Sequence, residues 1–213
     1  METLIYIALL IPAIPAILAA FKWSFLSDAQ RWFAYLLWMI VGVSFSGEIW
    51  NILTKESNLP FYHVYILLEY LILLQVFRCL FKGHIRPAIW NTLSIGFLFI
   101  WLGNVLFVEG IWGFPDYIHA LEAVVILMVV FKWFSVMLKE KATLHPETTF
   151  EFWFFAGLLL FFSGNFLLFL FSEFLLSIEQ AAYDVIWKVH CILNILLYIL
   201  YSIALLWVKK PIK

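Results

Sequence analysis

The chain has 213 residues, of which 65% are hydrophobic, and its 13 Lys and Arg against 14 Asp and Glu give a net charge of −1. An average soluble domain carries roughly a quarter charged residues. A soluble fold of this size cannot hide so much apolar surface, because much of any folded surface must contact water. The composition therefore indicates an integral membrane protein whose first partner is the lipid bilayer, and the near-neutral charge argues against nucleic acid as a partner.

Seven apolar segments follow one another along the chain, and each meets the length of about 20 residues that a helix needs to cross the hydrocarbon core. We expect an all-α fold, a single seven-transmembrane-helix bundle over residues 1–213. The first segment lacks the basic n-region of a signal peptide, so we expect it to be a retained helix. The predicted helices cover about 3–21, 32–53, 60–81, 88–108, 115–138, 150–172 and 183–207.

Lys and Arg are distributed unevenly between the two sides that these segments define. By the positive-inside rule, the side rich in Lys and Arg is cytoplasmic. The N-terminus is then outside, the C-terminus is cytoplasmic, and we expect a multi-pass protein of a bacterial cytoplasmic membrane. One side carries Lys22, Arg31, Arg78, Lys82, Arg86, Lys132, Lys139, Lys141, Lys209, Lys210 and Lys213, and the other carries Lys55 and Lys188.

Polar side chains interrupt the outer half of every segment from the second to the seventh, whereas the inner halves are almost entirely Leu, Ile, Val and Phe. An ionisable group in hydrocarbon costs roughly 2.5–3.5 kcal/mol and is a functional candidate by default. At 100° per residue these side chains share helix faces, which predicts one polar pocket open to the outer side. Its ligand-binding residues are predicted to be Glu48, Asn51, Tyr62, Glu69, Asn104, Glu122, Asn165, Asp184 and Asn194.

Three histidines at a similar depth suggest a metal in this pocket. His63, His119 and His190 belong to three different segments, and Glu122 lies one turn from His119. Catalytic zinc takes three such protein ligands and one water, which becomes acidic enough to attack an ester or amide. A zinc-dependent membrane hydrolase acting on a lipid ester or amide, with Glu69 or Glu48 as the general base, is therefore an alternative function.

Two further alternatives stay open. Asp184 and Lys188 have the Asp-x-x-x-Lys spacing of the last helix of microbial rhodopsins, and this resemblance implies a retinal protein in which Lys188 carries the chromophore. An ion pair between Asp184 and Lys188, one helical turn apart, also explains the two residues. Buried carboxylates and histidines also line transport routes, so a small-solute or proton transporter is the other alternative.

Short motifs in the chain resemble a group of small bacterial seven-helix membrane proteins that are similar to the membrane sensory regions of some histidine kinases. The motifs are residues 58–65 with Glu69, Phe152 and Trp153 with Gly157, and Trp187 with His190 and Asn194. The resemblance implies a receptor-like role, in which the pocket binds a small ligand or metal ion from the outer side. Because the chain leaves no room for an output domain, we expect a cytoplasmic signalling partner that contacts the connection 139–149.

Overall fold

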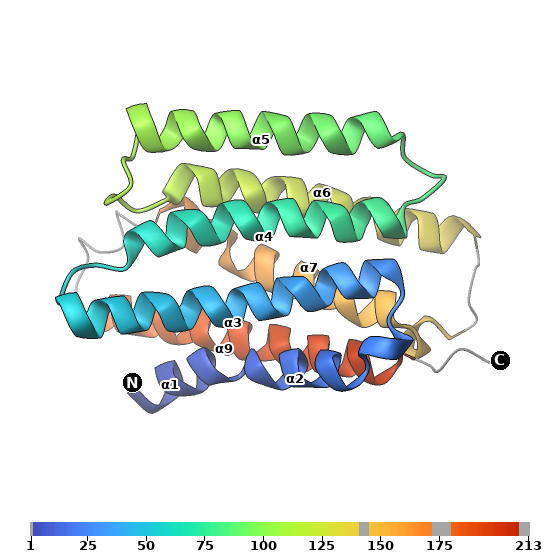
Figure 1. Cartoon of the computed structure of the whole chain (residues 1–213), viewed down its shortest axis with the longest axis horizontal. Coiled ribbons are helices and arrows are strands. Elements are labelled where there is room, and N and C mark those ends of the chain that lie inside the picture. The colour runs from blue at the N-terminus through green and yellow to red at the C-terminus, as the bar shows by residue number, and fades with distance from the viewer. Residues whose placement is uncertain (1, 141–144, 172–179, 209–213) are drawn as a thin grey trace. The chain divides into compact units, whose positions relative to one another are not determined.

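The computed structural model describes residues 2–140, 145–171 and 180–208, and within these ranges the chain is helical, with no strand (Figure 1). Two short helices, α1 and α2, precede the long ones. The helices are α1 (Glu2–Leu10), α2 (Ala13–Phe21), α3 (Asp28–Thr54), α4 (Leu59–Leu80), α5 (Pro87–Phe107), α6 (Asp116–Glu140), α7 (Phe150–Leu170) and α9 (Gln180–Leu206), with 3₁₀ turns η1 (Trp23–Phe25) and η2 (Pro146–Thr148).

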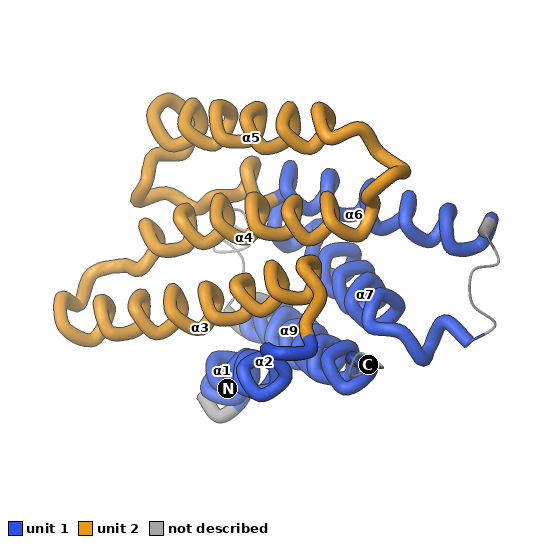
Figure 2. Tube along the Cα trace, turned by 45° about the vertical axis from the view of Figure 1, so that its right-hand side comes forward, with its two compact units in different colours: residues 1–25, 120–213 blue, residues 26–119 orange. Residues whose placement is uncertain are grey.

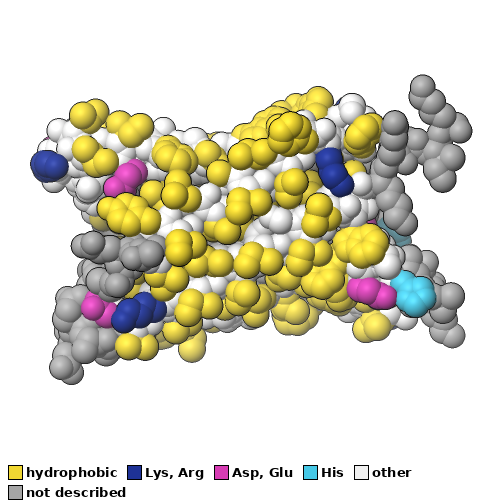
Figure 3. All heavy atoms as spheres, turned by 90° about the horizontal axis from the view of Figure 1, so that it is seen from below, with side chains coloured by type: hydrophobic (Ala, Val, Ile, Leu, Met, Phe, Trp, Pro, Cys, Tyr) yellow, Lys and Arg dark blue, Asp and Glu magenta, His cyan; other side chains and the backbone are white. Residues whose placement is uncertain are grey.

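Six of the described helices, α3, α4, α5, α6, α7 and α9, are long and apolar enough to cross a membrane. Their bounds agree with the last six predicted segments to within a few residues. Large apolar side chains such as Leu53, Phe99, Phe107 and Leu138 are more than two-thirds exposed, as expected of surfaces that contact lipid. Figure 3 shows one face on which hydrophobic side chains lie along the helices and charged side chains lie near their ends. The multi-pass helical prediction is confirmed to this extent.

The first segment differs from the prediction of one helix over 3–21. The structure breaks it at Ile11 and Pro12 into two helices of nine residues each. Proline lacks the N–H that an α-helix needs in its interior, and its ring clashes with the carbonyl one turn earlier. Pro12 therefore ends α1, and the segment is shorter than the six helices of spanning length. A seventh crossing remains a prediction.

The chain divides into two compact units (Figure 2), and each is described separately. Unit 1 contains residues 1–25 and 120–213, and unit 2 contains residues 26–119. Unit 1 therefore includes α1, α2, most of α6, α7 and α9, whereas unit 2 includes α3, α4, α5 and the first turn of α6. The prediction of a single domain over 1–213 stays a prediction.

In unit 2, α4 lies between α3 and α5 and packs against both (Figures 1 and 2). The helix α3 begins at a capping box, in which Ser27 and Gln30 hydrogen-bond each other's backbone. Such a box satisfies N–H groups that have no partner within a helix. The rings of Tyr70 on α4 and Phe97 on α5 stack at 3.7 Å. The buried residues of α4 recur every three or four positions and form a wide face: His63, Ile66, Glu69, Tyr70, Leu73, Leu74, Val76 and Phe77.

In unit 1, α9 packs against α7 and against α1 and α2. The approach of α7 to α9 is close at Gly157, where a Cβ atom would lie 3.2 Å from Leu197 Cδ1 and 3.4 Å from Leu200 Cβ. Small residues allow this approach between membrane helices, where packing rather than the hydrophobic effect drives association. Most of the other buried residues of α7 are phenylalanines, and Phe154 stacks on Tyr201 of α9 with ring centroids 5.8 Å apart.

Candidate ligand-binding site

His63 lies near the start of α4 and is completely buried. Its Nε2 lies 3.0 Å from the carbonyl oxygen of Gly113 in the connection between α5 and α6. A carbonyl can only accept, so Nε2 carries the proton of this hydrogen bond. In the neutral ring, Nδ1 is therefore the lone-pair nitrogen, and no described residue forms a hydrogen bond with it. The indole Nε1 of Trp101 donates to the His63 carbonyl at 2.9 Å, which fixes this turn of α4 against α5.

The connection between α5 and α6 is closed by Glu109, a residue that sequence reasoning missed. The Asn104 amide donates to its carboxylate, and the backbone N–H of Tyr117 donates to Glu109 Oε1 at 2.7 Å. Gly110 sits in the left-handed region with φ of 71°, which glycine adopts without strain. Asn104, predicted to bind a ligand, is thus buried and joined to the loop of its own unit. The signal in the sequence was a carboxylate directly after an apolar segment.

Glu69 lies farther along α4, and only 3% of its surface is exposed. The Tyr65 side chain, one turn earlier, forms a hydrogen bond with it. Glu69 Oε2 has no hydrogen-bond partner among the described residues. From His63 to Glu69 the helix rises about 9 Å and turns by about 120°. The two groups therefore present separate acceptor atoms inside unit 2.

The other predicted residues of unit 2 are less buried than His63 and Glu69. Glu48 on α3 and His119 on α6 are half-buried. Tyr62 is 38% exposed. Asn51 is exposed, and its Nδ2 donates to the Glu56 carbonyl at 3.0 Å. The Asn51 amide thus closes the end of α3, and its exposure differs from the inward position that the sequence predicted.

In unit 1, the structure brings His190 of α9 and Asn165 of α7 together. The Asn165 Nδ2 donates to the Phe161 carbonyl at 2.9 Å, so its Oδ1 is the acceptor that faces His190 Nδ1 at 2.9 Å. His190 therefore donates from Nδ1, and Nε2 carries the lone pair when the ring is neutral. Trp187 stacks on the same imidazole, with ring centroids 5.0 Å apart.

The remaining predicted residues of unit 1 lie on α6 and α9. Glu122 is fully buried on α6. Asn194 lies one turn from His190, and its Oδ1 is buried with no hydrogen-bond partner among the described residues. Asp184 is half-buried, and Lys188 is exposed. An exposed lysine near the start of a helix fits a side chain that reaches toward water.

The predicted pocket thus draws its residues from both units, and a single pocket over all of them stays a prediction. Unit 2 holds Glu48, Asn51, Tyr62, His63, Glu69, Asn104 and His119, and unit 1 holds Glu122, Asn165, Asp184, His190 and Asn194. Within either unit, the described residues include no group of three His, Cys, Asp or Glu side chains that could hold a metal ion.

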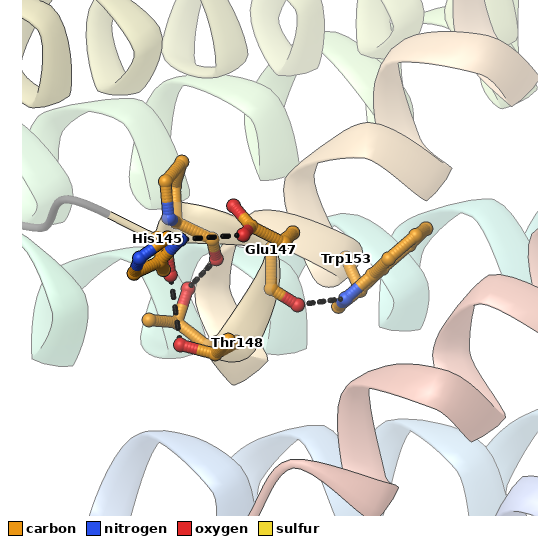
Figure 4. Close-up of polar contacts among 6 residues, drawn as sticks. His145, Glu147, Thr148 and Trp153 are labelled. Atoms are coloured by element: carbon orange, nitrogen blue, oxygen red, sulfur yellow. Dashed lines mark hydrogen bonds and ion pairs between the residues drawn. The ribbon is translucent and has the colours of Figure 1, made fainter.

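The predicted partner-binding connection is described from residue 145 onward, while residues 141–144 lie outside the described ranges. Figure 4 shows its hydrogen bonds: His145 Nδ1 lies 3.0 Å from Glu147 Oε1, and Trp153 Nε1 donates to the Glu147 carbonyl at 2.7 Å. The pKa of the exposed Glu147 carboxyl is lowered, first by a hydrogen bond from its own backbone and then by His145. The connection thus leaves a hydrogen-bonded carboxylate and imidazole exposed.

No protein-family model, curated protein or solved structure matches this chain.

Proposed function

We propose that the chain is a receptor-like protein of a bacterial cytoplasmic membrane that binds a small ligand or ion in the outer half of unit 2. One observation carries the proposal: His63 and Glu69 are buried on α4, and each keeps a polar atom that no described residue satisfies. A buried polar group without a hydrogen bond is costly. Ionisable residues retained inside membrane helices at this cost are expected to serve binding or transport.

The chemistry of these two atoms limits the class of ligand that the site can bind. The Nδ1 of neutral His63 and the carboxylate of Glu69 are both acceptors, so the ligand must supply N–H or O–H groups or positive charge. The two residues lie about 9 Å apart along the helix axis and about 120° apart around it, so they are not neighbours on one helix face, as two ligands of a single zinc ion from one helix would be. These features favour an organic ammonium compound. The His63 ring also forms a hydrogen bond with the Gly113 carbonyl. We therefore expect the binding of a ligand at His63 to move the connection between α5 and α6.

The contacts give less support to a zinc hydrolase and to a retinal protein. A zinc hydrolase needs three metal ligands at one point, and the described residues of neither unit provide such a group. The exposed position of Lys188 gives no support to a buried retinal. A cytoplasmic partner at the connection 139–149 stays part of the receptor proposal, and the exposed His145 and Glu147 are the groups that it would meet.

The test measures the unfolding temperature of the purified full-length protein in a neutral detergent. The probes are choline, putrescine, spermidine and, separately, zinc chloride. A ligand at 100 times its dissociation constant stabilises the native state by about 2.7 kcal/mol. We expect an ammonium probe to stabilise the wild type, and we expect Glu69→Gln, which keeps the shape and removes the charge, to abolish the shift.

Glu56→Gln is the matched control, because Glu56 is exposed outside the helices and its loss should leave the shift intact. Stabilisation that persists in Glu69→Gln contradicts the site, as does the absence of a shift with every probe. A shift caused by zinc alone, lost in His63→Gln, contradicts the ammonium assignment and returns the proposal to a metal ion.

A further inference from the structure

A cavity of about 940 Å³ lies within unit 2, at the end where α3 begins, α4 ends and α5 begins. This is the opposite end of α4 from His63. The volume is within the range of about 300–1,000 Å³ that is typical of small-molecule sites. The cavity is independent of the function proposed above, and none of the residues predicted to bind a ligand lines it.

The wall of this cavity is cationic. Arg78, Lys82 and Arg86 line it against a single carboxylate, that of Asp28 in the first turn of α3. The three cations form no ion pair with a described residue, and the one hydrogen bond of Arg78 is from Nη1 to the neutral amide of Asn91, at 3.3 Å. His84 is a fourth basic side chain of the wall. Among the described residues, three cationic side chains therefore face one carboxylate, and the net charge of the cavity wall is positive.

The local sequence holds these side chains in place. Gly83 has a φ of 90°, which lets the chain turn sharply between Lys82 and Arg86. Phe81 is buried below this turn and packs against the buried Trp90, with ring centroids 6.0 Å apart. Pro87 follows Arg86 in the first turn of α5, where its missing N–H costs nothing. Lys82, His84 and Arg86 are thus carried by a short connection between α4 and α5, and Arg78 is carried by the last turn of α4.

We propose that this cavity binds the phosphate of an anionic phospholipid headgroup. Arg presents a planar set of N–H donors that matches phosphate oxygens, and Lys adds a compact charge. Basic pockets between membrane helices on the cytoplasmic side suit such headgroups. Trp32 lines the same cavity and is 37% exposed, as expected of an aromatic side chain at the level of the headgroups. The predicted orientation places this end on the cytoplasmic side.

The test uses the full-length protein purified in a neutral detergent. It is titrated with phosphatidylglycerol or with phosphatidylcholine of the same acyl chains, and bound lipid is counted by native mass spectrometry. We expect the wild type to prefer phosphatidylglycerol by roughly tenfold or more, since each cation near an anionic lipid contributes measurably to binding. The variant Lys82→Gln/Arg86→Gln should lose this preference.

Lys132→Gln/Lys139→Gln is the matched control, because it also removes two exposed cations from the same predicted side, outside the cavity. It should keep the preference. Gel filtration and helical circular dichroism verify folding, and the single variants Lys82→Gln and Arg86→Gln replace the double variant if it fails these checks. Equal preference in the wild type and the cavity variant overturns the proposal, as does an equal loss in the control or no preference in the wild type.

A competition experiment distinguishes a lipid phosphate from the phosphate of a soluble compound. If excess inorganic phosphate does not displace phosphatidylglycerol from the wild type, the acyl chains contribute and the lipid is the ligand, as proposed. If inorganic phosphate displaces the lipid at stoichiometric occupancy of the cavity, a soluble phosphate compound is the ligand, and the lipid assignment is overturned while the anion site stands.

Discussion

Lys22 Nζ lies 2.9 Å from the carbonyl oxygen of Leu205, although the two residues are 183 positions apart. The same ammonium also donates to the carbonyls of Leu206 at 3.1 Å and Val208 at 3.2 Å. The last carbonyls of a helix have no N–H partner within it, and a cation there also interacts favourably with the helix dipole. Lys22 therefore terminates α9 in addition to adding positive charge at this end of unit 1.

Replacing Lys22 by Gln should lower the free energy of unfolding by about 1–2 kcal/mol, because charge-assisted hydrogen bonds to the carbonyls are lost. Lys22→Arg should retain most of the stability. Denaturant titration of the purified protein in detergent measures both. Lys132→Gln, at an exposed lysine of the same unit, is the control. Similar losses in Lys22→Gln and the control would show that charge, not the helix terminus, determines the effect.

The pair of Asn165 and His190 should show an energetic coupling between α7 and α9. In the single variant Asn165→Ala, the Nδ1 proton of His190 loses its acceptor. Hydrogen bonds between membrane helices average about 0.6 kcal/mol and reach about 1.7 kcal/mol. A double-mutant cycle with Asn165→Ala and His190→Ala should give a coupling in this range. Additive effects of the two changes would contradict the bond.

Gly157→Ala should be destabilising by about 1–3 kcal/mol, the usual cost of an extra methyl group in a packed contact. The added Cβ atom would lie 3.2 Å from Leu197 Cδ1, closer than an ordinary van der Waals contact, and 3.4 Å from Leu200 Cβ, so Leu197 has to move within a packed contact. Gly96→Ala on α5 is the control, since nothing lies within 4 Å of its Cβ position. There, alanine should be neutral or stabilising because it favours the helix. Equal destabilisation at both positions would refute this packing argument.

The orientation can be tested with single cysteines in a chain carrying Cys79→Ala and Cys191→Ala, the two native cysteines. A membrane-impermeant maleimide added to cells should label Lys55→Cys and should label Lys82→Cys only after permeabilisation. Glu2→Cys then distinguishes seven crossings from six. External labelling at position 2 supports a crossing by the first segment, and internal labelling rules it out. The reverse labelling of Lys55→Cys and Lys82→Cys would invert the topology.

Hydropathy was sufficient to predict the six long helices, because each is predominantly apolar over a window of 18 residues despite its few polar side chains. Hydropathy did not predict the break at Pro12, because a single proline changes the mean hydropathy of a long apolar segment only slightly. Window hydropathy reports how favourable a segment is in lipid but not whether its backbone N–H groups are all present. The bounds of α1 and α2 depend on that second property.

The site was predictable in part. Helical spacing placed His63 and Glu69 on inward positions of α4, and both are buried. It did not predict that the Asn51 amide closes α3 or that Asn104 binds Glu109, since these bonds depend on the path of two connections. Likewise, the distribution of Lys and Arg predicted which side of the membrane the connections face. The cavity that Arg78, Lys82 and Arg86 line depends on how three helix ends meet, which no spacing in the sequence specifies.

The helix α4 runs without interruption for 22 residues between two chemically different ends. His63 lies near its beginning and Arg78 near its end, about 22 Å apart along the axis. The sequence between His63 and Arg78 contains no proline or glycine, the residues at which helices usually kink. One continuous helix of unit 2 therefore sets the positions of both the buried imidazole and the cationic wall of the cavity.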